Sequence, residues 1–137
     1  MLLYWGLASS SFAWEAKSGA ICILDHQEPI AEVRLTYDPA IPEYSITVRR
    51  ADSDWLAAPL FGITFDGSRG LSITTNRHDV DGPSVTVRDS GFGNVLNGLE
   101  FNDTATAVLG QQTVTVSLEG AAPEVQKFRA CTTAPIA

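Results

Sequence analysis

Basic residues are scarce in this chain of 137 amino acids, which has nine Lys and Arg against 16 Asp and Glu. The formal net charge is −7 at pH 7, and among the cations only Arg49 and Arg50 are adjacent. Such a chain has no basic surface to attract a phosphate backbone or an anionic lipid headgroup. Nucleic acid is therefore not expected as a partner.

Long apolar runs and flexible linkers are also missing from the sequence. A membrane-spanning helix needs about 20 apolar residues in succession, so no transmembrane segment is expected. No stretch rich in Pro, Gly and Ser divides the chain, and its length suits one folded unit. We expect a single domain over residues 14–137.

The first thirteen residues, MLLYWGLASSSFA, carry no charge. An apolar stretch leads to Ser11-Phe12-Ala13, a small-x-small pattern that a signal peptidase cleaves after the last residue. Residues 1–13 are therefore predicted to be a signal peptide, and the protein to be periplasmic or secreted. No Lys or Arg precedes the apolar stretch, so a start further upstream and an ordinary first strand stay open as alternatives.

Only two cysteines are present, Cys22 and Cys131, near opposite ends of the chain. In an exported protein two cysteines usually pair. A disulfide across so long a loop stabilises a fold by about 4–5 kcal/mol in the chain-entropy model. The alternative is two buried free thiols in a cytosolic protein. No CxxC or CxxH cluster exists, so neither a metal nor a cofactor is expected.

Apolar and polar residues alternate through most of the chain. Side chains of a strand point to opposite faces in turn, so each alternating segment has one face for a core and one for water. Many such segments predict an all-β fold, an antiparallel β-sandwich of about eight strands. The clearest segments are 33–37, 44–48, 61–65, 71–75, 84–88, 104–109 and 113–118.

Turn residues between these segments suggest which strands pair. We expect 33–37 to pair with 44–48, 61–65 with 71–75, 71–75 with 84–88, and 104–109 with 113–118.

Helices are predicted at two places. Asp52-Ser53-Asp54 is typical of a cap before a short helical turn through Ala57. Near the end, Pro123 suits a first helical turn, and Val125 and Phe128 make an apolar stripe. This short C-terminal helix would bring Cys131 to the strand that carries Cys22. The stretch 92–101 fits a strand or a helix.

Catalytic patterns are weak. Asp89-Ser90-Gly91 after an apolar strand matches the aspartic-protease signature, in which two carboxylates share a proton. However, Arg88 and Phe92 stand where that family has an apolar and a small residue, and a polar turn with a capping aspartate explains the motif better. Ser90 with His78 lacks the G-x-S-x-G turn of many serine hydrolases. We expect no enzyme.

A binding surface is the remaining hypothesis, because loops on a rigid sandwich commonly carry binding sites. Asp79-Val80-Asp81-Gly82 has the look of a calcium loop, but alignment on Gly82 places arginines at the first and last ligand positions. Trp55 lies in a loop-like stretch and offers an aromatic platform for a sugar, although most such aromatics pack in cores. The candidate surface residues are Trp55, Arg77, His78, Asp79, Asp81, Asp89 and Asn94.

The second half of the chain, from GFGNVLNGLEF to KFRAC, resembles a group of small exported bacterial proteins of uncharacterised function. The shared layout is an early Cys, a strand that ends in a step such as Leu118-Glu119-Gly120-Ala121, and a short helix that ends at the second Cys. More distantly, the layout of residues 14–131 is similar to the invasion-associated locus B family of periplasmic β-rich proteins.

Together these observations predict an exported, non-enzymatic envelope or interaction protein whose partner is a protein or glycan of the cell envelope. The alternatives are a small carbohydrate-binding module and a hydrolase that uses the Asp89-Ser90-Gly91 turn.

Overall fold

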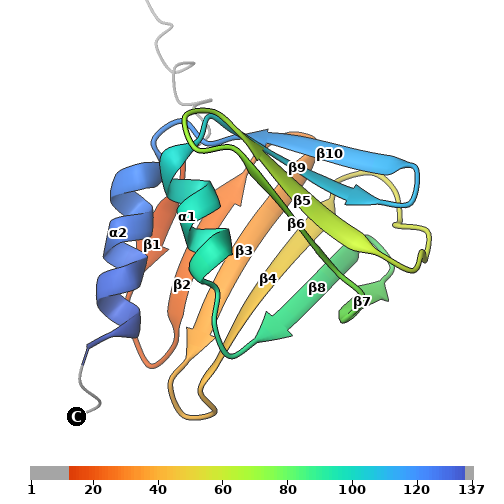
Figure 1. The fold of residues 1–137 in the computed structure, drawn as a ribbon. Coiled ribbons are helices and arrows are strands. Elements are labelled where there is room, and N and C mark those ends of the chain that lie inside the picture. Colours follow the sequence, from red (N-terminus) through yellow and green to blue (C-terminus); the bar gives the residue numbers. More distant parts are fainter. Residues whose placement is uncertain (1–12, 135–137) are drawn as a thin grey trace, which may run out of the picture.

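Residues 13–134 are described by a computed structural model, and they form two antiparallel sheets with two helices at one side (Figure 1). Most of the predicted signal peptide, residues 1–12, lies outside the described residues. The strands, in chain order, are β1 Glu15–Lys17, β2 Cys22–Gln27, β3 Ala31–Asp38, β4 Glu43–Arg50, β5 Phe61–Asp66, β6 Leu71–Thr75, β7 His78–Asp81, β8 Ser84–Asp89, β9 Thr104–Leu109 and β10 Gln112–Ser117. The helices are α1 Gly93–Phe101 and α2 Ala121–Thr132.

The predicted antiparallel β-sandwich with a short C-terminal helix is confirmed. One sheet has six strands in the order β1-β2-β3-β4-β8-β7, and the other has four in the order β10-β9-β5-β6. The two strands beyond the predicted eight are β1 and β7, with three and four residues. Alternation needs about four residues to show, so β1 is too short for it and β7 only just reaches this length.

Three of the four predicted strand pairs are confirmed, namely β3 with β4, β5 with β6, and β9 with β10. The pairing of 71–75 with 84–88 is wrong. β6 pairs with β5 alone, whereas β8 pairs with β4 and with β7. Asn76 and Arg77 carry the chain from the four-stranded sheet to the other one, so the turn that follows β6 changes sheets and makes no hairpin.

The predicted helical turn at residues 52–57 is also wrong, because this segment is irregular. Its backbone bonds to distant parts of the chain. The Trp55 N–H donates to the Gly82 carbonyl at 3.0 Å, and the Leu56 N–H donates to Gln112 Oε1 at 2.7 Å. These partners replace the local bonds of a helix.

The stretch that fitted either a strand or a helix forms α1, and the predicted C-terminal helix is α2. α2 lies beside α1, β1 and β2 (Figure 1). It buries Val125 and Phe128. The predicted disulfide is present, with the Cα atoms of Cys22 and Cys131 5.9 Å apart. Within the part of the chain that the structure describes, no helix is long and apolar enough to cross a membrane.

Candidate binding cleft between the sheets

A cleft of about 580 Å³ opens between the two sheets. β4 and β8 of the six-stranded sheet form one side, β5 and β6 of the four-stranded sheet form the other, and the start of α1 closes one end. Its volume lies within the range of about 300–1,000 Å³ that is usual for ligand sites. The seven apolar side chains that line it are Ile46, Phe61, Ile63, Ile73, Val87, Phe92 and Val95.

The cleft exists because the two sheets differ in strand number. β6 is the last strand of its sheet, while the opposite sheet has six strands. The alternation of apolar and polar residues places Ile73 of β6 and Val87 of β8 on the inner faces of their strands. Both side chains nevertheless stay partly exposed. Apolar side chains left open to water at the border of a core favour the binding of an apolar group.

Polar groups are few at this cleft. Among the described residues that line it, Asp89 is the single charged one, and Asn94, Thr74 and Thr75 add uncharged polar groups. Oδ1 of Asp89 accepts hydrogen bonds from the Ser90 N–H at 2.7 Å and the Ser90 hydroxyl at 3.5 Å. The first turn of α1 has no side-chain cap in the described chain. The cleft therefore combines an apolar wall with one carboxylate and with backbone N–H donors.

Two residues hold α1 in the position that closes the cleft. Gly98 lies against the Phe65 ring, so closely that a Cβ atom there would overlap the ring. The Asn102 side chain accepts from the Arg69 N–H at 3.0 Å and donates to the Arg69 and Gly98 carbonyls at 2.9 and 3.0 Å. The end of α1 is thus fixed to the β5–β6 turn, and its first turn is left to line the cleft.

Of the predicted surface residues, Asp89 and Asn94 line this cleft. His78, Asp79 and Asp81 lie on the neighbouring edge strand β7, and Arg77 lies in the turn before it. The Asp79 carboxylate is 3.7 Å from the Arg88 guanidinium, and the His78 ring contacts the Ala58 carbonyl through Nε2 at 2.9 Å. The structure therefore brings two of these residues into one site and places four beside it.

Trp55 is the clearest error among the surface residues. Its side chain is only 3% exposed, and the indole N–H donates to the Val48 carbonyl at 3.1 Å. The Arg50 guanidinium lies 5.3 Å from the ring centroid. The irregular 52–57 segment folds the ring into the core, so it offers no platform to a sugar.

The described residues do not assemble a catalytic or metal centre from the predicted motifs. The Ser90 hydroxyl hydrogen-bonds to the neighbouring Asp89, and the His78 ring hydrogen-bonds to the Ala58 carbonyl. No group of three or more His, Cys, Asp and Glu residues with metal-binding geometry occurs in residues 13–134.

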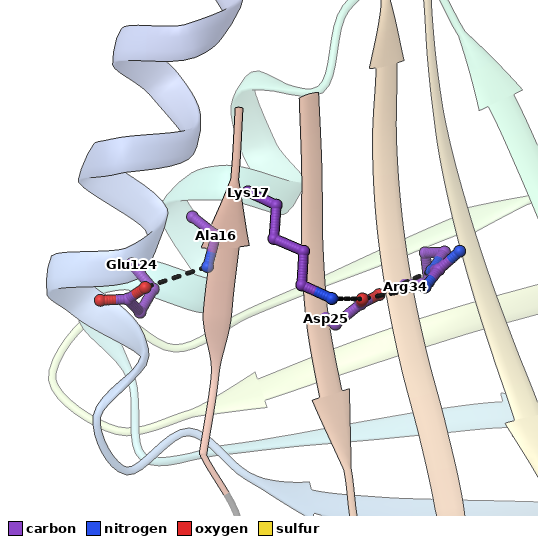
Figure 2. Close-up of polar contacts among 5 residues, drawn as sticks. All are labelled: Ala16, Lys17, Asp25, Arg34 and Glu124. Atoms are coloured by element: carbon purple, nitrogen blue, oxygen red, sulfur yellow. Dashed lines mark hydrogen bonds and ion pairs between the residues drawn. The ribbon is translucent and has the colours of Figure 1, made fainter. Parts of the chain in front are cut away.

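A second hollow, of about 550 Å³, lies on the outer face of β1–β4 and is lined by charges of both signs. Asp25 contacts the Arg34 guanidinium through both carboxylate oxygens at 2.6 and 2.9 Å, and Lys17 at 3.5 Å (Figure 2). The hydrogen bond to Asp25 raises the pKa of Arg34. Since these charges neutralise one another, this face is less suited to a ligand than the cleft.

The same region ties α2 to the sheet edge. Oε1 of Glu124 accepts from the Ala16 N–H at 2.9 Å, and Oε2 lies 3.0 Å from Lys127 Nζ (Figure 2 shows the first contact). The hydrogen bond from Ala16, followed by the contact with Lys127, lowers the pKa of the Glu124 carboxyl.

Sequence reasoning missed the apolar lining of the cleft, of which Ile73 and Val87 are the partly exposed members. The alternation of apolar and polar residues only assigns them to the core. Whether another strand covers them depends on how many strands each of the two sheets has.

No family model matches this sequence, and comparisons with curated proteins and with solved structures found no match.

Proposed function

We propose that the protein is an exported, non-enzymatic binding protein of the cell envelope, and that it binds an apolar group in the cleft between β4–β8 and β5–β6. The observation that carries the proposal is the apolar cleft itself, left open where the four-stranded sheet ends at β6.

The disulfide supports the part of the proposal that places the protein in an oxidising compartment outside the cytosol. Such bonds persist mainly in exported proteins, where no thiol pool reduces them. The uncharged start of the sequence and the pattern Ser11-Phe12-Ala13 point to the same compartment.

The chemistry of the cleft supports binding over catalysis. Hydrolysis needs a nucleophile and a base in mutual contact. Among the described residues the Ser90 hydroxyl instead hydrogen-bonds only to Asp89, and Asp89 has no second carboxylate beside it in the cleft lining. The burial of Trp55 removes the feature that favoured a sugar module.

The test uses the neutral apolar dye N-phenyl-1-naphthylamine. We expect saturable fluorescence enhancement at one site, and an Ile73→Asp variant to lose at least tenfold in affinity because a carboxylate then lies in the apolar wall. The matched control is Ser72→Asp on the outward face of the same strand, which should bind as the unmodified protein does. Equal binding by both variants would refute the cleft as the site.

A fluorophosphonate probe, which labels catalytic serines, tests the proposal that the protein is not a serine hydrolase. We expect no labelling of Ser90, and stoichiometric labelling would overturn the non-enzymatic proposal.

A further inference from the structure

β6 is a sheet edge with unused backbone groups. It pairs on one side with β5 over Leu71–Thr75, and no other backbone or side-chain group within residues 13–134 bonds to its main chain. An extended strand in this state presents N–H and C=O groups that another strand can pair with.

Two of the other three sheet edges, β1 and β7, are protected, and the third, β10, is bonded only at its end. At β1, the Ala16 N–H bonds to Glu124, and α2 packs along the strand. At β10, only the last residue has such partners: the Ser117 N–H donates to Glu28 at 2.7 Å and its carbonyl accepts from the Trp14 indole at 2.9 Å. β10 also differs from β6 in that none of its residues lines the cleft. β7 has only four residues, of which Asp79 and Asp81 are exposed charges. Short length and charge are common protections against unwanted strand pairing.

The cleft runs beside this open edge. Three successive residues of β6, from Ile73 to Thr75, line it, as do Val87 and Asp89 across from them on β8. A strand added here would therefore pair with the backbone N–H and C=O groups of β6. One of its faces would contact the apolar residues of the cleft. Figure 1 shows β6 crossing over the six-stranded sheet, with α1 beside it.

We infer that the occupant of the cleft is a short extended peptide segment that adds to β6 as a fifth strand. Every second side chain would enter the apolar cleft and cover Val87 and Ile46, since side chains of a strand alternate between faces. Main-chain pairing supplies the affinity in this mode of recognition, and the alternate side chains supply the specificity. The inference rests on the proposed function, because it names the class of ligand for the same cleft.

The charge of the cleft indicates which peptide segments would bind there. Asp89 is the one charged residue among the described residues that line the cleft, and the whole chain has a formal net charge of −7. A segment with a Lys or Arg next to its apolar residues complements this carboxylate, whereas an acidic segment is repelled.

The experiment titrates the unmodified protein with the capped peptide Lys-Val-Thr-Val-Thr-Val-Lys by calorimetry. A lysine at each end allows either strand direction. Two further peptides carry backbone N-methyl groups, one on the three valines and the other on the two threonines. In an extended strand the N–H groups of alternate residues point to the same side. We expect one of these two peptides to lose at least tenfold in affinity and the other to bind as the parent does.

Amide hydrogen exchange gives a second measurement. Peptide binding should slow exchange within residues 71–75, and Asp89→Asn should weaken the lysine peptide several-fold while leaving a glutamine-ended peptide unchanged. Equal behaviour of the two N-methyl peptides, or no protection on β6, would overturn strand addition.

Other outcomes separate the two proposals. Binding of the naphthylamine dye without binding of any peptide overturns the peptide inference and leaves the cleft as a binding site. Failure of both dye and peptide overturns both proposals. A dimer that Ile73→Asp converts to a monomer would assign the edge to a second copy of the chain, and the inference would be wrong.

Discussion

Gly98 has room for a hydrogen atom and for nothing larger. A Cβ atom at this position would overlap the ring of Phe65, which is only 1% exposed. Alanine favours a helix over glycine by up to about 1 kcal/mol, but overpacking a core costs about 1–3 kcal/mol. We expect Gly98→Ala to lower the free energy of unfolding, as measured by urea denaturation.

The control for this substitution is Gly93→Ala in the first turn of the same helix. A Cβ atom there meets nothing within 4 Å, so the free energy of unfolding should stay unchanged or rise slightly. If Gly98→Ala is as stable as Gly93→Ala, the close contact between α1 and Phe65 is wrong.

At the scale of elements, Glu124 connects α2 to β1. The pKa of its carboxyl is lowered in the folded chain from the ordinary 4.5 by the Ala16 N–H and then by Lys127. A lowered pKa means that the ionised carboxylate stabilises the fold, fully above about pH 4.5, and that this contribution disappears as the pH falls through the lowered value. We expect Glu124→Gln to reduce Tm at pH 7 more than at pH 3.

The matched control is Glu119→Gln, an exposed carboxylate just before α2. It should leave Tm unchanged at both values of pH. A loss of Tm for Glu124→Gln that is the same at pH 3 and pH 7 would contradict the role of the ionised carboxylate.

For the whole molecule, the single disulfide joins residues 109 positions apart and fixes α2 to β2. Its removal restores conformational freedom to nearly the entire unfolded chain. In the chain-entropy model the loss of stability is about 4–5 kcal/mol, which is a large share of the 5–15 kcal/mol that holds a typical domain together. We expect the Cys22→Ala, Cys131→Ala double variant to melt at a Tm many degrees lower, as measured by calorimetry. A Tm that does not change would show that packing of α2 alone is sufficient.

The eight longer strands and the C-terminal helix were predictable from local patterns. Alternation identifies a strand and its inner face without knowledge of its neighbours. The errors lie where the outcome depends on distant residues. Asn76 and Arg77 form a turn that joins two sheets, and Trp55 enters the core because Gly82 and Val48 accept its two N–H groups.

The sequence by itself determined the all-β class, the faces of most strands and the two cysteines that form the bond, because these depend on side-chain period and on residue type. Only the tertiary structure decided that one sheet has six strands and the other four, and hence that β6 ends its sheet beside an apolar cleft. Strand order is set by contacts between segments far apart in the chain, and no local pattern of residues encodes the edge that those contacts leave open.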